Sequence, residues 1–179
     1  MSQIWFASDL HFCHDRDFIW GARGFKSIYL MNEAIVKNFS EVVSWKDDLY
    51  ILGDCFLNDN EQGMRLMRQL PGKKHIIWGN HDTNTRQELM REEGFDCLGY
   101  AHQQKFNGQS FYLSHYPTLT ANLDNDKPLS KRVINLSGHT HYKDKFYDGN
   151  PLIYNVAVDA HDCYPVNITT ILDDIKKAI

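Results

Sequence analysis

Short apolar runs alternate with helically spaced apolar residues along the first half of the chain. The runs predict buried strands at Gln3–Ser8, Leu49–Leu52 and His75–Trp78. The helical spacing predicts helices at Ile28–Val43, Asn60–Leu70 and Arg86–Glu93. The second half is mostly strand, so the whole pattern predicts an α/β fold with one mixed sheet, or two stacked sheets, and helices outside.

A β-hairpin begins the second half. Two strand-like segments, Tyr100–Phe106 and Gln109–Ser114, flank the dipeptide Asn107-Gly108, which is typical of a type I′ turn. Two further strands and a last helix are predicted at Val133–Ser137, Leu152–Val158 and Ile168–Ala178.

Length and composition are those of an ordinary globular protein. Of the 179 residues, 42% are hydrophobic and 23% are charged, so residues 1–179 are expected to form one domain. The net charge of -4, without a basic block, argues against strong non-specific nucleic-acid binding. No apolar run has membrane-spanning length and the N-terminus lacks the basic start of a signal peptide, so no membrane partner is expected. The four cysteines form no CxxC pair, which indicates reduced thiols and a cytoplasmic location.

Polar residues of metal-ligand type follow five of the predicted strands. These residues are Asp9, His11, Asp54, Asn80, His81, His115, His139 and His141. In open α/β sheets, ligands bind beyond the carboxyl ends of the strands. Each position alone could be a turn, a loop cap or a hydrogen-bonded histidine. Five strand ends that all carry such side chains indicate one shared site, because that coincidence is improbable.

The segment Gly138-His139-Thr140-His141 can be interpreted either as part of a metal site or as a hairpin end. In a pleated strand, residues i and i+2 face the same way, so the two imidazoles could converge. Converging neutral imidazoles indicate a metal ion. The alternative is a hairpin end with two solvated histidines.

In chain order, the segments SDLH, LGD, GNHD, SHYP and SGHTH resemble the five motifs of the calcineurin-like metallophosphoesterases. Each motif alone is weak, but the ordered set from Asp9 to His141 is specific. The segment YNVAVDAHDCYPVN resembles the ending of a compact, single-domain bacterial and phage branch of that superfamily. The resemblance implies a four-layer α/β/β/α sandwich of two mixed sheets flanked by helices.

The resemblance also implies a dinuclear metal centre. One ion would be held by Asp9, His11, Asp54 and His141, and the other by Asp54, Asn80, His115 and His139, with Asp54 as the bridge. A mixed shell of this kind suits two divalent ions such as Mn, Fe, Zn or Ni. Two such ions about 3.5–4 Å apart can clamp a phosphoryl group while a bridging hydroxide attacks phosphorus. The implied activity is hydrolysis of phosphate esters, above all phosphodiesters, of small molecules or nucleotides.

His81 is predicted to be catalytic and not a metal ligand. The matching histidine of the family stabilises the transition state or protonates the leaving oxygen, a task that suits imidazole. The phosphoprotein phosphatase branch orients this histidine with an aspartate three residues after the bridging one. Leu57 occupies that position here, which disfavours protein phosphatase activity.

Residues in the polar loop after the first motif are candidates for binding the substrate. His14, Arg16 and Arg23 lie there, and arginine pairs well with phosphate oxygens. Each could equally be a solvated loop side chain. Cys13 and Cys55 flank metal motifs and are interpreted as small buried hydrophobic residues.

Other functions remain open. A phosphomonoesterase or nucleotide phosphatase would need cations for the extra charge, for which the chain offers Arg16, Arg23, Lys131 and Arg132. A non-catalytic metal-binding scaffold of the same fold is the second alternative, and the complete ligand set with His81 argues against it. A nuclease of the recombination-repair type is disfavoured, because such enzymes carry an extra DNA-binding domain.

Overall fold

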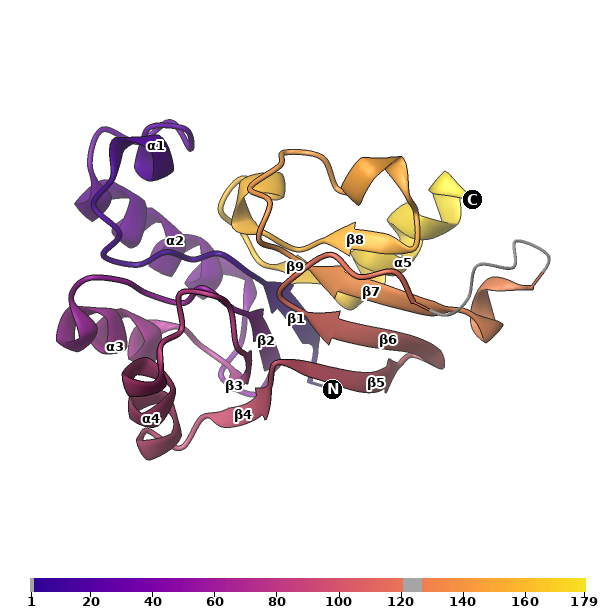
Figure 1. Ribbon diagram of the computed structural model, residues 1–179, viewed down its shortest axis with the longest axis horizontal. Coiled ribbons are helices and arrows are strands. Elements are labelled where there is room, and N and C mark those ends of the chain that lie inside the picture. Colours follow the sequence, from indigo (N-terminus) through magenta and orange to yellow (C-terminus); the bar gives the residue numbers. More distant parts are fainter. Residues whose placement is uncertain (1, 121–126) are drawn as a thin grey trace.

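The computed structural model, which describes residues 2–120 and 127–179, contains two stacked mixed sheets flanked by helices (Figure 1). The first sheet has the strand order β4-β3-β2-β1-β9 and the second has the order β5-β6-β7-β8. The strands of the first sheet are β1 (Ile4–Ala7), β2 (Asp48–Leu52), β3 (Lys73–Ile77), β4 (Asp96–Gly99) and β9 (Val166–Asn167). Strands β1 to β4 are parallel, and β9 pairs antiparallel with β1.

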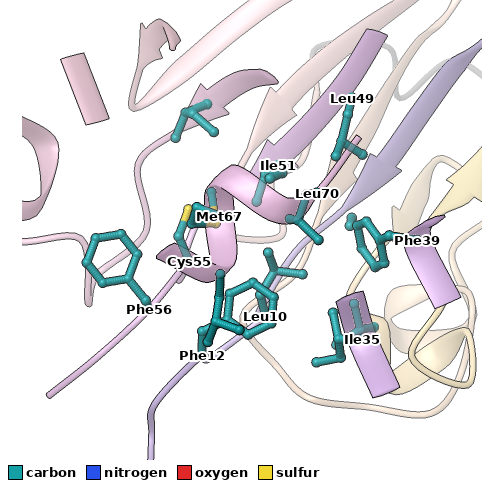
Figure 2. Packing of buried hydrophobic residues seen from close by; sticks show 14 of the residues in the cluster. Leu10, Phe12, Ile35, Phe39, Leu49, Ile51, Cys55, Phe56, Met67 and Leu70 are labelled. Atoms are coloured by element: carbon teal, nitrogen blue, oxygen red, sulfur yellow. The ribbon is translucent and has the colours of Figure 1, made fainter. Parts of the chain in front are cut away.

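Both faces of the first sheet are buried, as the unbroken apolar runs predict. In β2, Leu49 and Ile51 face a core shared with the helices, whereas Tyr50 and Leu52 face the second sheet. The helices on that first face are α2 (Ile28–Val42), α3 (Asn60–Gln69) and α4 (Asn84–Glu92). Figure 2 shows this core, in which side chains of the helices pack against the strands and against the loops that follow them.

The second sheet is formed by β5 (Ala101–Phe106), β6 (Gln109–Ser114), β7 (Val133–Ser137) and β8 (Ile153–Asn155). The turn between β5 and β6 has φ of 49° at Asn107 and 82° at Gly108, which confirms the predicted hairpin and its turn type. The C-terminal helix α5 (Ile168–Ala178) adds three buried isoleucines to the core between the sheets. The predicted class, an α/β fold with two mixed sheets flanked by helices, is confirmed.

Some short elements were missed by the sequence analysis. They are α1 (Asp17–Trp20), β4, β9, and the 3-10 helices Leu129–Lys131, Tyr147–Gly149 and Val158–Ala160. Helix α1 is too short for a periodic pattern, and β9 exists only because it pairs with β1. The predicted strand Leu152–Val158 is shorter in the structure, since its last residues turn towards the loop after β1, where Val158 N donates to Ser8 O at 3.1 Å.

The topology brings the polar strand ends together. The parallel strands β1, β2 and β3 end at one edge of the first sheet, and the parallel strands β6 and β7 end at one edge of the second. A bridge between Ser8 and Ala157 joins these two edges. In the described residues, no helix is long and apolar enough to cross a membrane. All four cysteines are free thiols.

Candidate metal centre

The backbone is left-handed at five of the candidate ligands. The φ angle is 57° at Asp9, 50° at His11, 55° at Asp54, 71° at His139 and 54° at His141. Such values are uncommon outside glycine, although aspartate and histidine tolerate them better than most residues. Conformations of this kind persist where the surrounding structure fixes them, and they cluster at functional sites.

Backbone hydrogen bonds fix the loops after β1 and β2 against each other. Asp9 N donates to Gly53 O, and His11 N donates to Asp54 O, both at 3.0 Å. The side chain of His115 reaches the same place from β6, where its Nδ1 lies 2.8 Å from Leu52 O. These hydrogen bonds therefore join the loops after β1 and β2 of the first sheet to the residue that follows β6 of the second.

Asp82, which the sequence analysis did not single out, joins the loops after β2 and β3. Its buried carboxylate accepts hydrogen bonds from the backbone N of Asp54 at 2.9 Å, Cys55 at 3.1 Å and Gly79 at 2.8 Å. Gly79 must be glycine, because a Cβ atom there would collide with the side chain of Asp54. Asp82, the last residue of the segment GNHD, thus fixes the backbone of Asp54, the candidate ligand in the segment LGD.

The two carboxylate oxygens of Asp9 differ in their hydrogen bonds. Oδ2 accepts hydrogen bonds from Ser8 Oγ at 2.5 Å and from His139 N at 2.9 Å. Oδ1 and the Nε2 of His11 are both buried and, among the described residues, have no hydrogen-bond partner. These two atoms lie 3.8 Å apart. Buried polar atoms without partners are rare in native proteins, and two that face each other indicate a missing ligand.

Asp54 lies between histidines that come from different strands. Its Oδ2 is 3.6 Å from His11 Nε2, 3.5 Å from His115 Nε2 and 4.0 Å from His81 Nε2. Its Oδ1 accepts a hydrogen bond from His81 N at 2.9 Å. Asp54 Oδ2 thus lies close to both His11 Nε2 and His115 Nε2, which belong to the two predicted ligand sets.

Three of the candidate histidine ligands, His11, His115 and His141, are oriented through their Nδ1 atoms. Nδ1 of His141 lies 3.1 Å from Asp159 Oδ2, and Nδ1 of His11 lies 3.1 Å from Nδ1 of His14. Together with the bond from His115 to a carbonyl oxygen, these contacts leave each Nε2 to face the carboxylates. An outer partner of this kind is what metal-binding histidines usually have. Asp159 directly follows the last predicted strand. A polar residue at a strand end is the signal that identified the candidate ligands, and the same signal could have identified Asp159.

Two groups of ligand atoms could each hold an ion. They are Asp9 with His11 and His141, and Asp9 with Asp54 and His115, and within each group the ligand atoms lie within 4.8 Å of one another. Asp9 is shared in this grouping, whereas the resemblance implied Asp54 as the shared ligand. The position of Asp54 Oδ2 between His11 and His115 allows that role as well.

The two remaining predicted ligands lie beside the second group. Asn80 Oδ1 is 3.0 Å from Nε2 of His115. The His139 ring lies 5.1 Å from the His115 ring, at an interplanar angle of 70°. Tyr116 packs on the other side of His139, with ring centroids 4.6 Å apart. The fold therefore gathers all seven predicted ligands in one place.

Burial dominates the electrostatics of this cluster. It lowers the pKa of His11 to about 4 and raises the pKa of Asp54 to about 6. Burial alone would also raise the pKa of Asp9, but the contact with His11 and the charges of His115 and His141 hold that pKa well below its usual range. The unprotonated imidazole of His11 beside the ionised carboxylate of Asp9 forms a donor set that a divalent cation fits.

Arg23, a predicted substrate-binding residue, is engaged inside the protein. Its guanidinium pairs with Asp159 through Nε at 2.9 Å and Nη2 at 2.8 Å. It also donates to the backbone oxygens of Asp9 at 2.7 Å and Leu10 at 3.3 Å, and its side chain is only 3% exposed. The structure thus places Arg23 where it holds the first ligand loop, and its donors do not face a substrate.

The other two predicted substrate-binding residues lie at the surface. Arg16 is exposed, and its backbone oxygen accepts a hydrogen bond from Ile19 N in α1. His14 is partly buried and lines a cavity of about 400 Å³ beside the metal ligands. The cavity is lined by His11, His14, Phe18, Ile19, Ala22, His81, His141, Lys143 and Asp159. His81, the predicted catalytic residue, therefore faces the same space as His14, and 43% of its side chain is exposed.

The two cysteines beside the motifs pack with the hydrophobic core. Cys55 is fully buried, and Cys13 packs against the same cluster. Burial raises the pKa of the Cys13 thiol to about 11 and that of the Cys55 thiol well above its usual value. Both cysteines therefore behave as small hydrophobic residues that pack with the core, as the sequence predicts.

Residues 3–157 match the calcineurin-like phosphoesterase superfamily domain, and the chain belongs to this family. It is similar to the uncharacterized protein MJ1445 of Methanocaldococcus jannaschii, with 30% identity over 181 residues that cover 99% of this chain and 93% of that protein. It is also similar to the gene 66 protein of Mycobacterium phage D29, with 26% identity over 207 residues and 100% coverage of both chains.

Two solved structures resemble the fold. AQ665 of Aquifex aeolicus, a protein of unknown function, has a TM-score of 0.71 with 25% identity and 100% coverage of both chains. YfcE, a phosphoesterase from E. coli, has a TM-score of 0.50 with 20% identity, covering 87% of this chain and 78% of that one. The predicted superfamily is confirmed, and the latter likeness concerns the fold alone.

Proposed function

We propose that this protein is a metal-dependent phosphodiesterase with a dinuclear centre. The proposal rests on one observation: Asp9 Oδ1 and His11 Nε2 are buried, lie 3.8 Å apart and have no hydrogen-bond partner within residues 2–120 and 127–179. The residues that would hold the ions are Asp9, His11, Asp54, Asn80, His115, His139 and His141. Divalent ions bound there would activate water and neutralise phosphoryl charge, and Mn, Fe, Zn and Ni all suit the donor set.

His81 is the residue that we assign to the leaving oxygen. It is partly exposed, lines the cavity and follows Asn80 directly, yet its Nε2 is 4.0 Å from Asp54 Oδ2. The histidine is held through its backbone, because His81 N donates to Asp54 Oδ1. An imidazole in this place can give a proton to the departing alkoxide, which is typically worth about 10²–10⁴-fold in rate.

The preference for diesters rests on the cations near the site. A phosphomonoester carries an extra charge, which arginine would match best. Arg23 is paired with Asp159, while Arg132 is buried and donates from Nε to Lys127 O. Neither Lys131 nor Arg132 lines the cavity. None of the four cations named for a monoesterase, Arg16, Arg23, Lys131 and Arg132, lines the cavity, and the lysine that does, Lys143, is exposed.

The decisive experiment is metal-dependent turnover. Protein stripped with a chelator should lose activity on bis(p-nitrophenyl) phosphate and regain it with Mn, Ni or Co. Metal analysis of the reloaded protein should give two ions per chain. Turnover of p-nitrophenyl phosphate should not exceed turnover of the diester. Full activity of the stripped protein would refute the metal dependence, and a clear monoester preference would favour the phosphatase alternative. The absence of any turnover with bound metal would favour a scaffold.

The four free thiols fit a reducing compartment. On that ground the proposal includes a cytoplasmic location, and the test is fractionation of cells that express the tagged protein.

A further inference from the structure

The cavity beside the metal ligands has a wall that the metal centre does not require. Helix α1 and the residues after it contribute the apolar side chains of Phe18, Ile19 and Ala22 to the lining. The volume of about 400 Å³ is in the range of small-molecule sites, about 300–1,000 Å³. A metal-bound phosphate alone would not need this space.

Phe18 offers a flat apolar surface at the cavity. The residue is 66% exposed and lines the cavity. The ring meets the His14 ring edge to face, with centroids 5.9 Å apart and an interplanar angle of 87°. Aromatic faces exposed beside a cavity can stack against a planar ring of a ligand.

Lys143 supplies a cation to the same cavity. It is exposed and, across residues 2–120 and 127–179, has no ion-pair partner. Asp159, the acidic residue in the lining of the cavity, is already paired with Arg23 and bonded to His141. The charge of Lys143 is therefore available to an anionic group of the substrate.

We propose that this cavity holds the leaving arm of the phosphodiester, and that it selects arms carrying a planar ring and a second anionic group. Phe18 stacks on the ring and Lys143 binds the anion. This inference rests on the proposed phosphodiesterase function and names its substrate class. His81 lines the cavity, so it lies next to the oxygen of an arm bound there.

The reaction balances without a further reactant. The oxygen of a water molecule forms a new bond to phosphorus, and the phosphorus–oxygen bond to the arm in the cavity breaks. The arm departs as an alcohol after its oxygen takes a proton from His81. A proton from the attacking water restores the histidine.

The test compares two dinucleotides that differ in one charge. Diadenylate with a 5′-phosphate carries a second anion on its 3′-oxygen arm, and diadenylate without that phosphate does not. The wild-type protein should prefer the phosphorylated dinucleotide through a lower KM. It should cleave the bond to the 3′-oxygen, so that the products are two molecules of adenosine 5′-monophosphate.

Two variants separate the ring from the charge. Phe18→Ala should raise KM for both dinucleotides by about 3–10-fold, as expected for a lost aromatic contact. Lys143→Gln should raise KM only for the phosphorylated one, by about 3–5-fold, because the lysine is exposed and its pairing is screened. Tyr29→Ala and Lys46→Gln are matched controls, since both residues are exposed and neither lines the cavity. These controls should leave both KM values unchanged.

Binding of adenosine 5′-monophosphate to metal-stripped protein, measured by calorimetry, tests the cavity without catalysis. Phe18→Ala and Lys143→Gln should each weaken it. Unchanged KM values and unchanged binding in both variants would overturn the inference. The inference would also be overturned by equal KM values for the two dinucleotides or by no turnover of either. Release of adenosine 3′,5′-bisphosphate from the phosphorylated dinucleotide would overturn it as well. Metal-dependent turnover of bis(p-nitrophenyl) phosphate would still stand in each case, so failure of this inference is distinct from failure of the proposed function.

Discussion

Asp159 holds the imidazole of His141, with Oδ2 3.1 Å from Nδ1. The same carboxylate is paired with Arg23, whose guanidinium also donates to the backbone oxygen of Asp9. One buried ion pair thus orients a candidate ligand from the second sheet and fixes the loop that carries a ligand from the first. The bond raises the pKa of His141 although burial alone would lower it.

Replacement of Asp159 should therefore weaken metal binding without removing a ligand. We expect Asp159→Asn to lower the affinity for Mn by about 10–100-fold, the usual effect of losing an outer partner of a histidine ligand. The measurement is a metal titration of folded protein, with folding checked by circular dichroism. Asp162→Asn is the control, because Asp162 is exposed and three residues further along. Equal affinities of Asp159→Asn and wild type would show that this bond does not support the ligand.

Asp54 should govern how many ions are held. Its Oδ2 lies 3.6 Å from His11 Nε2 and 3.5 Å from His115 Nε2, so Asp54→Asn should lower the metal content from the proposed two ions per chain. Turnover should fall by the equivalent of about 3–5 kcal/mol of transition-state stabilisation. Elemental analysis and kinetics of the same samples measure both effects. Asp144→Asn, at an exposed position shortly after His141, should match the wild type. Full metal content in Asp54→Asn would argue against a bridging role.

His81→Ala should separate catalysis from metal binding. Turnover should fall by about 10²–10⁴-fold while metal content stays unchanged, because we propose that this histidine acts on the leaving oxygen. His115→Ala, His139→Ala and His141→Ala should instead lower metal content. The loss in His81→Ala should be smaller for p-nitrophenyl esters than for alkyl esters, since p-nitrophenolate leaves without a proton. If His81→Ala loses its metals, or cleaves alkyl esters at the wild-type rate, our assignment is wrong.

Asp47 should contribute stability that depends on pH. Its carboxylate accepts hydrogen bonds from Gln3 N, Trp5 Nε1 and Ser44 N. Burial alone would raise the pKa of Asp47, but these bonds hold it below its usual value. A lowered pKa in the folded state means that the stabilisation is complete above the unfolded pKa, about 3.9, and is lost as the pH falls through the folded pKa.

Asp47→Ala should accordingly lower the free energy of unfolding by about 1–3 kcal/mol at pH 7, because three donors lose their acceptor. Urea unfolding of both proteins measures this difference. The difference should be constant from pH 7 to pH 5 and should shrink below about pH 4. A difference that grows on acidification would contradict this role for Asp47.

The sequence predicted the strands and helices that have strong periodic patterns. Strands β1, β2 and β3 are buried on both faces and therefore appear as unbroken apolar runs, while α2 keeps one apolar face. The hairpin turn at Asn107 was visible because few residue pairs adopt a type I′ turn. Elements without a local pattern, such as α1 and β9, could not be found in this way.

The candidate ligands could also be named from the sequence, since each follows a strand and the ordered segments are specific. The contacts that hold these ligands could not be predicted, because they join residues far apart in the chain. Asp159 lies 18 residues from His141 and 136 from Arg23, and Asp82 binds a backbone N 28 residues away. The left-handed backbone at Asp9 and His141 is likewise set by the loops packed around them.

The sequence by itself thus determined the α/β fold class, because hydrophobic periodicity is a local feature, and the family, because the ordered motifs resemble it. Only the tertiary structure decided which atoms meet there. It left Asp9 Oδ1 and His11 Nε2 buried without a hydrogen-bond partner among the described residues, turned Arg23 inward to Asp159, and placed Phe18 and Lys143 on one cavity. The physical reason is that burial and pairing depend on which segments the sheets bring together, and that is a property of the packed chain.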